Sequence, residues 1–396
     1  MDDVVIAGGG PAGALAACLL ARRGARVTLI ERARFPRAKL CGDTLNPGAM
    51  ALLARHFDIE PLRRRGRPLD GMILSGPGGV SVTGAYARGM AGLAITRDVF
   101  DTWLVEQAVR AGAILVEDTA VVGPLPGDAP GSVGGVVTRH RSGRGAVVPA
   151  ILTMAADGGR SRLARAMGLA RAPRRPRRWA IGAYYEGVDG LIGMGEMHVR
   201  QGHYLGVSHT LDGRTNACLV REFAPGRGSW PGPDHLLREA IDGDVVLGPR
   251  FRRARRVTRT QVLGPLAVEA ARPACPGLWL VGDAAGFIDP MTGDGIHLAL
   301  KGAEVAAAVA GALIEGGLDA SEAHRHYARA LGHKLDTKRR FNRVLRRLVA
   351  SPRTVAAAAR LASIAPAAFA LAIRHAGDCG DAGRVGAARS FEEARA

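Results

Sequence analysis

Lysine, cysteine pairs and long apolar runs are scarce in this chain of 396 residues, and each scarcity excludes a class of protein. The formal net charge is +18, but only four of the 54 basic residues are lysines, so nearly all of the positive charge is arginine. Together with the many alanines and glycines, this is typical of the coding bias of a GC-rich genome. The sequence contains no zinc finger, no aromatic-rich RNA-binding motif and no basic region joined to heptads. We therefore do not expect nucleic acid as a partner.

No segment has the ~20 uninterrupted apolar residues that a membrane-spanning helix needs. Residues 356–373 come nearest, but Arg360 and Pro366 interrupt them. The chain begins Met1-Asp2-Asp3 and enters an apolar run without the basic segment of a secretory signal. We expect a cytoplasmic protein that could also rest on a membrane face.

The five cysteines are odd in number and scattered along the chain. They form no C-x-x-C pair and have no neighbouring histidine, so neither a disulfide framework nor a metal site is indicated. We expect reduced thiols at each of them: Cys18, Cys41, Cys218, Cys275 and Cys379.

The first 31 residues form a β-α-β unit around a glycine-rich turn, Gly8-Gly9-Gly10-Pro11-Ala12-Gly13. Strands are expected before and after a helix that runs from Ala14 to Arg23. In G-x-G-x-x-G the first glycine makes the turn, the second lets the backbone approach a pyrophosphate, and the third lets helix and strand pack closely. Glu31 ends the second strand, where an acid can bind both hydroxyls of an adenosine ribose. An acid there favours FAD or NAD over a 2′-phosphorylated cofactor.

Two further motifs stand at the ends of apolar strands. The first is Asp157-Gly158-x-x-Ser161, and the second is Gly282-Asp283 after the strand Trp279–Val281. A turn over residues 290–295 then runs into an apolar helix. Its N-terminal N–H groups and the helix dipole favour negative charge, such as that on the pyrimidine edge of a reduced flavin.

The three motifs, in this order and spacing, resemble the FAD-dependent oxidoreductases of the para-hydroxybenzoate hydroxylase type. This class includes geranylgeranyl reductases and flavin-dependent halogenases. The resemblance implies an α/β fold with a Rossmann-type FAD-binding domain, a mixed or antiparallel substrate sheet and a helical C-terminal extension. We expect the FAD-binding domain at residues 1–70, 96–175 and 264–318, the substrate domain at 71–95 and 176–263, and the extension at 319–396.

The resemblance also implies roles for individual residues. The FAD pyrophosphate would lie on the turn, and the adenosine ribose on Glu31 with Arg32 beside it. Arg97 would lie along the phosphates or the ribityl chain, and Asp283 would bind the ribityl chain. Asp157 would order the loops around the cofactor. NAD(P)H is the implied electron donor, although the arginine of the hydroxylase motif is replaced by Ala164. The complete set of expected FAD-binding residues is Gly8, Gly10, Pro11, Ala12, Gly13, Glu31, Arg32, Cys41, Arg97, Asp157, Asp283, Pro290, Gly293, Gly295 and Ile296.

Within this class, the segments at residues 39–43 and 293–296 look like the geranylgeranyl reductase branch, in which the Cys41 segment lies at the face of the flavin. That branch has a Tyr-x-Trp-x-Phe-Pro signature. Here Tyr204 is kept, but Gly206 and Ser208 replace the Trp and the Phe. The Trp-x-Trp-x-Ile-Pro signature of halogenases is absent.

Three residues are catalytic candidates, each with a structural alternative. Cys41 is either a thiol near the flavin or a small buried residue at a turn. His297 either hydrogen-bonds the pyrimidine edge or is an ordinary first-turn histidine. Tyr204 lies on a predicted substrate-domain strand, as do His198, His203 and His209, and one of them could face the substrate.

The sequence leaves three functions open. We first expect a monooxygenase, in which reduced FAD and O2 hydroxylate a hydrophobic aromatic or quinone-like substrate. The second is a reductase of isoprenoid or other alkene double bonds, and the third is a non-catalytic FAD-binding maturation partner. The oligomeric state stays open.

The C-terminal region reads as all helix from Ser321 onward. Lys334 to Arg347 carries seven basic residues and one acid, with Phe341, Val344 and Leu345 on an apolar face. This pattern fits a helix that presses on anionic lipid, and it also fits a helical lid or a dimer contact. We expect the arginine clusters at 63–67, 171–178 and 250–256 to be mostly solvated.

Overall fold

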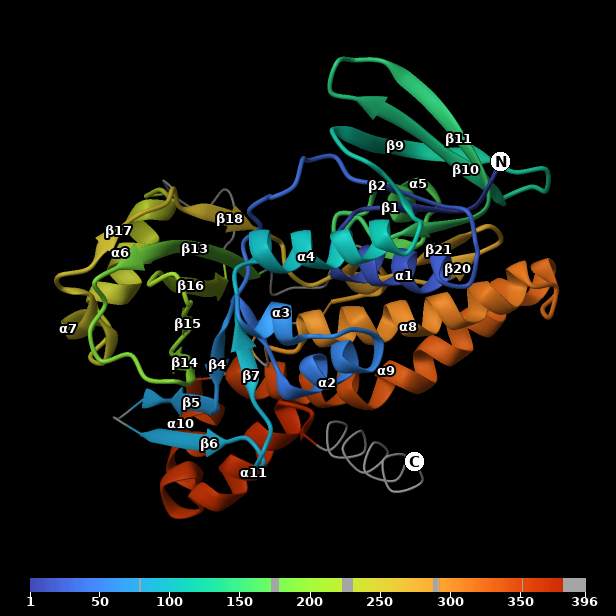
Figure 1. Ribbon diagram of the computed structural model, residues 1–396. Helices are drawn as coiled ribbons and strands as arrows, with labels where there is room; N and C mark the ends of the chain where they lie inside the picture. Colours follow the sequence, from blue (N-terminus) through green and yellow to red (C-terminus); the bar gives the residue numbers. More distant parts are fainter. Residues whose placement is uncertain are drawn as a thin grey trace, which may run out of the picture.

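A computed structural model of the chain describes residues 1–77, 80–171, 178–222, 231–287, 291, 293–350 and 352–379. Two large sheets lie side by side, and helices from the C-terminal third join them (Figure 1). This is the expected α/β fold with a helical C-terminal region.

The N-terminal sheet contains the predicted β-α-β unit. Its central strands are parallel and apolar, and Val4, Val5 and Ile6 of the first strand are fully buried. The strand order is β20 (Ala274–Cys275), β21 (Leu278–Leu280), β11 (Gly145–Ala155), β1 (Asp2–Ala7), β2 (Val27–Ile30) and β8 (Ile114–Val116). β10 (Val133–His140) pairs with the outer part of β11 on one side and with β9 (Thr119–Pro126) on the other, which forms an antiparallel meander.

Helices α1 (Pro11–Ala21), α4 (Arg97–Arg110) and α8 (Gly295–Ile314) cover one face of this sheet (Figure 1). α8 has the length and composition of a membrane-spanning helix, but half of it is buried and it packs between α1 and α9 (Ala320–Ala350). α9 is fastened to the sheet by Tyr327, which stacks on Trp279 and donates a 2.6 Å hydrogen bond to the Leu280 carbonyl. α8 is therefore a core helix of this domain.

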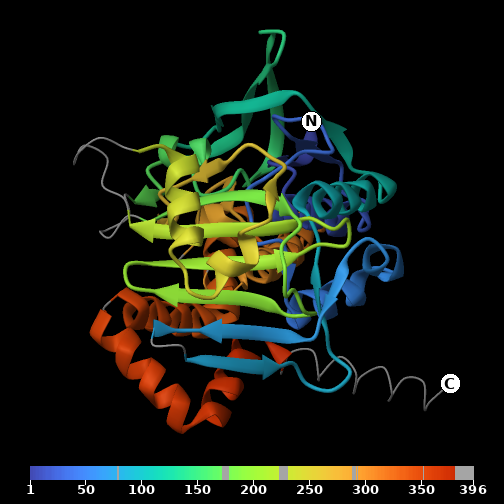
Figure 2. The same ribbon diagram turned by 90° about the vertical axis from the view of Figure 1, so that its left-hand side faces the viewer.

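The second sheet is mostly antiparallel. Its order is β17 (Arg255–Arg256), β13 (Arg178–Glu186), β16 (Thr215–Glu222), β15 (His203–His209), β14 (Gly195–Arg200), β5 (Gly71–Ser75) and β6 (Ser81–Ala85), with β18 (Gln261–Leu263) also on β13. Alternate residues face opposite sides, so Leu205 and Val207 pack under α6 (Pro233–Asp242) and α7 (Leu247–Phe251). Tyr204 faces the other side, toward the C-terminal helices. Figure 2 shows α6 and α7 in front of this sheet.

The strands expected in residues 71–95 divide between two sheets. β5 and β6 extend the second sheet, whereas β7 (Gly92–Ala94) pairs with β3 (Thr44–Leu45) and β4 (Arg67–Leu69) beside α2 (Pro47–His56) and α3 (Glu60–Arg63). The smaller connecting elements are α5 (Arg162–Ala166), β12 (Ala170–Arg171), β19 (Glu269–Ala270) and the 3-10 turn η2 (Gly282–Ala285).

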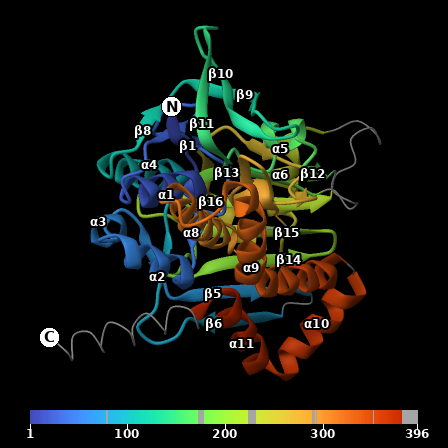
Figure 3. The ribbon, with the colours of Figure 1, turned by 90° about the vertical axis from the view of Figure 1, so that its right-hand side faces the viewer.

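The C-terminal extension is helical, as expected. α9 is followed by α10 (Pro352–Ile364) and α11 (Pro366–Ala376), which form a sharply bent pair packed on β6 (Figure 3). This pair lies at the opposite end of the molecule from the meander of β9 and β10 (Figures 2 and 3).

Candidate functional site

The glycine-rich turn between β1 and α1 has the geometry that its spacing predicts. Gly8 has φ +106°, and a Cβ on Gly13 would lie 2.0 Å from the Gly8 carbonyl oxygen. By contrast, a Cβ on Gly10 would meet its nearest protein atom at 4.0 Å. The first and third glycines are therefore required by the protein itself, whereas Gly10 leaves open space at the N-terminus of α1. Pro11 and Ala12 are buried in the first turn of that helix.

A row of alternating charges begins at Glu31. Its carboxylate accepts hydrogen bonds from the Gly9 N–H at 2.9 Å and from Arg37 at 3.4 Å. Arg37 also donates to Asp101 at 3.0 Å, and Asp101 receives both arms of Arg97 at 2.8 Å. Arg97 is thus held on α4 at the edge of the expected cofactor site, and Arg37 joins it, a role that no sequence motif predicted.

Asp283 lies in η2 directly after β21, as the motif predicts. Gly282 has φ +63°, and a Cβ there would lie 2.8 Å from Ala12 of α1, so the turn and the helix approach closely. The Lys39 ammonium has its pKa lowered by burial and by the Arg97 charge, while Asp283 and Asp101 oppose that shift. The Lys39 segment and the Asp283 turn therefore share one electrostatic environment.

The N-terminus of α8 adjoins this turn. Gly295 and the buried Ile296 begin the helix, and Gly293 precedes it with φ +64°. Asn342 of α9 donates to both oxygens of the buried Asp294, at 3.2 and 2.9 Å. Pro290, also expected at the flavin, lies outside the described residues. A cavity lined by η2, the start of α8 and α9 runs alongside.

His297 is held by the C-terminal extension. It is 1% exposed, and its Nδ1 lies 2.9 Å from the Asp378 carboxylate. Burial acts to raise the pKa of Asp378, but the His297 hydrogen bond and the Lys338 ammonium lower it to about 2. Lys338 also donates to the last carbonyls of α11, those of His375 and Ala376, at 2.9 Å. The extension therefore fixes the orientation of His297.

Cys41 lines a second cavity, which we call the Cys41 cavity. It has about 500 Å³ of empty space, part of it open to solvent, and lies between the 38–41 segment, the start of α4 and strands β13 and β16. Burial raises the pKa of the Cys41 thiol, although the Arg97 charge opposes that shift. The sulfur is therefore a neutral thiol at neutral pH.

Behind this cavity lies a buried carboxyl that the sequence did not single out. Asp43 is fully buried with φ +54°. It accepts a short hydrogen bond from the Tyr184 hydroxyl and one of 2.6 Å from the Asn216 amide. Tyr184 and Asn216 are cross-strand partners on β13 and β16, and both line the cavity. The Asp43 Oδ1 atom has no hydrogen-bond partner among the described residues.

The surroundings of Asp43 make it titratable near neutral pH. Burial raises its pKa to about 7, and the hydrogen bonds from Tyr184 and Asn216 and the charge of Arg97 limit the rise. Burial and the Asp43 charge also raise the pKa of Tyr184, so its phenol keeps its proton. Together they form an acid pair that can move a proton to the cavity wall.

The remaining predicted residues lie elsewhere. Tyr204 is 3% exposed and packs in an apolar cluster with Met197, Val199 and Val220. Arg32 is exposed beside Glu31. Asp157 accepts a 3.0 Å hydrogen bond from the Arg162 N–H and so shapes the loop before α5.

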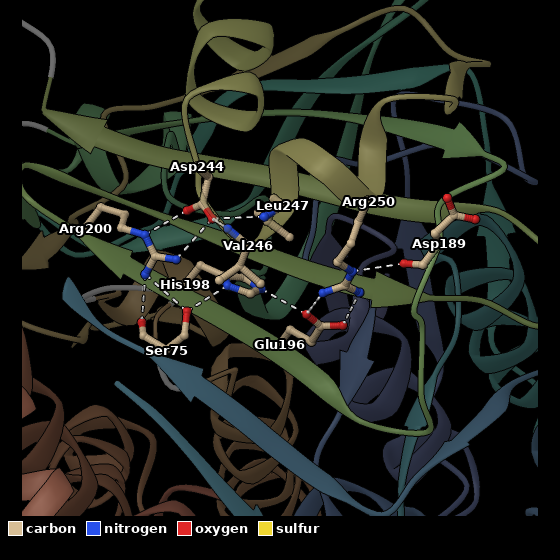
Figure 4. Close-up of polar contacts among 9 residues, drawn as sticks. All are labelled: Ser75, Asp189, Glu196, His198, Arg200, Asp244, Val246, Leu247 and Arg250. Carbon is tan, nitrogen blue, oxygen red and sulfur yellow. Dashed lines mark hydrogen bonds and ion pairs between the residues drawn. The ribbon is translucent and has the colours of Figure 1, made fainter. Parts of the chain in front are cut away.

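Ser75, His198 and Glu196 have the composition of a hydrolytic triad (Figure 4). The Ser75 hydroxyl lies 2.8 Å from His198 Nδ1, and His198 Nε2 lies 2.9 Å from Glu196. Arg200 donates to Ser75 at 3.1 Å, and Arg250 pairs with Glu196 through two bonds of 2.7 and 2.8 Å. Because Ser75 is only 4% exposed, a substrate cannot reach it. The network instead fastens the α6–α7 region to the sheet.

The described residues around the turn fit FAD. Gly10 leaves room for a pyrophosphate, Glu31 is placed for a ribose, and Asp283 with the α8 N-terminus is placed for the ribityl chain and the flavin.

Comparisons with known proteins agree with this assignment. Residues 1–181 match the FAD binding domain family. The chain is 31% identical to a digeranylgeranylglycerophospholipid reductase of Methanopyrus kandleri over 325 residues, which cover 79% of this chain and 78% of that one. A 6-methylpretetramide 4-monooxygenase of Streptomyces rimosus is 45% identical over 87 residues, which cover 22% of this chain and 21% of that one.

A solved structure shares the fold. A geranylgeranyl bacteriochlorophyll reductase-like protein from Thermoplasma acidophilum superposes with a TM-score of 0.77 at 24% identity, over 89% of each chain. The sequence match over most of the chain also establishes the family. The chain belongs to the FAD-dependent oxidoreductases of the para-hydroxybenzoate hydroxylase and geranylgeranyl reductase superfamily.

Proposed function

We propose that this protein is an FAD-dependent reductase that saturates carbon–carbon double bonds in a hydrophobic, isoprenoid-like substrate. The observation that carries this proposal is the Asp43–Tyr184 acid pair at the wall of the Cys41 cavity. Reduction of an alkene adds a hydride to one carbon and a proton to its neighbour. Reduced FAD, when bound, supplies the hydride.

The residues of the cavity would supply the proton. With Asp43 protonated, the hydrogen bond that Tyr184 now donates to it would reverse, so the carboxyl would donate to the Tyr184 oxygen and the phenol hydrogen would be free to face the substrate. Tyr184 would give this proton to the alkene carbon and recover one from Asp43, which solvent then reprotonates. The Cys41 thiol would line the same space as a neutral, polarisable contact.

The apolar surroundings support a hydrophobic substrate. The cluster around Tyr204 includes Leu40 of the Cys41 segment, Phe287 after η2 and Val355 of α10. It therefore links the flavin-side segments to the C-terminal helices through apolar contacts. The Cys41 cavity itself also carries cationic side chains, among them Arg97, Arg214 and Arg259, so its substrate would join an anionic head group to a hydrocarbon chain.

The test uses FAD-loaded, chemically reduced protein under argon with a digeranylgeranyl glycerophospholipid. Mass spectrometry should show two hydrogens gained per double bond, both of them deuterium when the chemical reduction and the reaction are run in D2O, because the hydrogens of the reduced flavin exchange with solvent. Tyr184→Phe should lower kcat by about 10²–10⁴-fold without loss of FAD, which is the usual contribution of a positioned acid. Tyr185→Phe is the matched control, because Tyr185 faces the opposite side of the sheet against Phe251. An equal loss in both variants would contradict the assignment of the proton donor.

Hydroxylation is the second candidate, favoured by the 45% identity to a monooxygenase over 87 residues. A product that gains one oxygen atom under air, with no reaction under argon, would replace the reductase proposal with this one. In either reaction we propose NAD(P)H as the electron donor. Substrate-dependent oxidation of NADPH tests that part separately.

A further inference from the structure

The bend between α10 and α11 exposes apolar side chains that nothing in the described chain covers. Leu361 is 56%, Ile364 81% and Leu371 66% exposed. The inner side of the same helices is packed, because Val355, Ala362 and Ile373 are each less than 9% exposed. A surface helix of a soluble domain normally turns polar residues outward. This pair instead exposes three large apolar side chains on its outer side.

The shape of the pair suits a surface rather than a span. Only the two helices together are long and apolar enough to span a membrane. The break between them, however, bends the pair by 109°. Ile364 ends α10 and Pro366 starts α11, so the most exposed apolar residue is at the apex. The apex lies at one end of the molecule (Figures 2 and 3).

The charge around the apex is of one sign. Residues 352–377, which include both helices, contain three arginines and no aspartate or glutamate. Arg353, Arg360 and Arg374 are exposed on the two helices that carry the apolar residues. Exposed apolar side chains flanked by cations match the interface of an anionic bilayer, where acyl chains receive the former and phosphates the latter.

We propose that the α10–α11 bend docks the protein on the surface of an anionic lipid membrane, with Leu361, Ile364 and Leu371 inserted among the lipids. A second copy of the chain fits this surface less well, because it would bring the same cations into contact. This docking surface differs from the one that the sequence predicted, which was the basic helix at residues 334–347. Phe341 and Leu345 of α9 are half-buried, and Phe341 packs against His375, so these two residues of the expected apolar face contact the protein, whereas Val344 is 54% exposed.

Docking at this point suits the proposed reaction but does not depend on it. Val355 and Leu345 of the extension belong to the apolar cluster that reaches Leu40 and Phe287 on the flavin side. The docking helices are therefore joined to the flavin side of the molecule by packed apolar contacts. Membrane binding can be measured without any substrate.

The test is flotation of the full-length FAD-loaded protein with vesicles of phosphatidylcholine alone or mixed with phosphatidylglycerol. Binding should be strong only with phosphatidylglycerol, and it should weaken as salt rises from about 0.1 to about 1 M because screening shortens the Debye length. Ile364→Gln and Leu371→Gln should each weaken binding about tenfold, since each removes an inserted aliphatic side chain. Arg353→Gln should weaken it less.

Val245→Gln is the matched control, because Val245 is 78% exposed in the α6–α7 connection. It should bind vesicles like the unmodified protein, and all variants should keep their Tm and FAD. Equal binding to both vesicle types, or unchanged binding in Ile364→Gln and Leu371→Gln, would overturn the proposal. Sedimentation without lipid gives a further check. A dimer that these two substitutions dissociate would assign the surface to a second copy instead.

Discussion

Glu196 and Asp43 are both buried carboxyls, 4% and 0% exposed, yet their surroundings push their pKa values in opposite directions. Burial acts to raise the pKa of Glu196, but the paired Arg250 and the His198 hydrogen bond outweigh it and lower the pKa. Asp43 receives only neutral donors, from Tyr184 and Asn216, while nearby Arg97 is already paired with Asp101. Burial therefore prevails and raises its pKa to about 7.

This comparison distinguishes a buried carboxylate that stabilises the fold from a buried carboxyl that can exchange a proton. A buried carboxylate with its own cation stays ionised and holds elements together, as Glu196 does between β14 and α7. A buried carboxyl without one can exchange a proton near neutral pH. The triad-like composition around Glu196 is thus the less reactive of the two sites.

The largest expected effect comes from breaking the paired site. Glu196→Gln should lower the free energy of unfolding by about 3–5 kcal/mol, because it leaves the Arg250 charge buried without its partner. Urea denaturation measures the change. The double variant Glu196→Gln/Arg250→Met should recover much of the loss, since no unpaired charge remains. If Glu196→Gln is as stable as the unmodified protein, the Glu196–Arg250 pair does not contribute to the free energy of unfolding.

The unpaired site should respond to pH with a definite sign. The folded pKa of Asp43, about 7, lies above its unfolded value, so the folded state holds the proton more tightly. Its contribution to stability is complete below about pH 4 and is lost as the pH rises through about 7, by up to about 4 kcal/mol. Asp43→Asn should remove this fall in a series of denaturation curves. Glu196, with its lowered pKa, should show the opposite slope, losing its contribution as the pH falls through its folded pKa. If the contributions of Asp43 and Glu196 to the free energy of unfolding change with pH in the same direction, the two sites do not differ as described.

A smaller change should sharpen the comparison. Tyr184→Phe removes a hydrogen bond that stabilises the ionised Asp43, so the pKa of the carboxyl should rise by about one further unit, equivalent to about 1.4 kcal/mol. Infrared titration of the protonated carboxyl band measures this shift. Tyr185→Phe should leave the band unchanged, and a fall in the pKa of Asp43 would contradict the described bond.

The smallest effect is expected at an exposed ion pair. Glu315 pairs with Arg23 at 2.9 Å, but their side chains are 53% and 41% exposed. Glu315→Gln should change the free energy of unfolding by less than about 1 kcal/mol, because water and salt screen the pair. A loss as large as that of Glu196→Gln would show that pairing alone, without burial, governs these sites.

The parts of the fold that depend on neighbouring residues could be predicted from the sequence. The β-α-β unit and the apolar helix that begins at Gly295 follow from local spacing, and the structure has both. Arg250 is a partial correction, because it lies in a cluster expected to be mostly solvated but is 16% exposed on its side chain and paired with Glu196. Its partner is 54 residues away, and periodicity carries no information on such a pairing.

The acid pair was missed for the same reason. Asp43 stood in a segment that the sequence singled out for its cysteine, but Tyr184 lies 141 residues further on. Only the register of β13 against β16, which places Tyr184 opposite Asn216, brings the two side chains to one carboxyl. Likewise, the position of His297 after Gly295 predicts that it lies near the turn expected at the flavin. Its contact with Asp378, in contrast, depends on the path of α9, α10 and α11.

Lys338 connects the end of α11 to the residues directly before α8. Its ammonium lies 3.7 Å from Asp294 before α8 and 3.1 Å from Asp378, while it donates to the final carbonyls of α11. Trimming the chain before α11 would strip this buried cation of most of its partners and leave it facing Asp294. The position at which the polypeptide is cut, tagged or fused therefore affects the residues directly before α8. A shortened chain needs α11 if Lys338 is to keep the partners that it has beside Asp294.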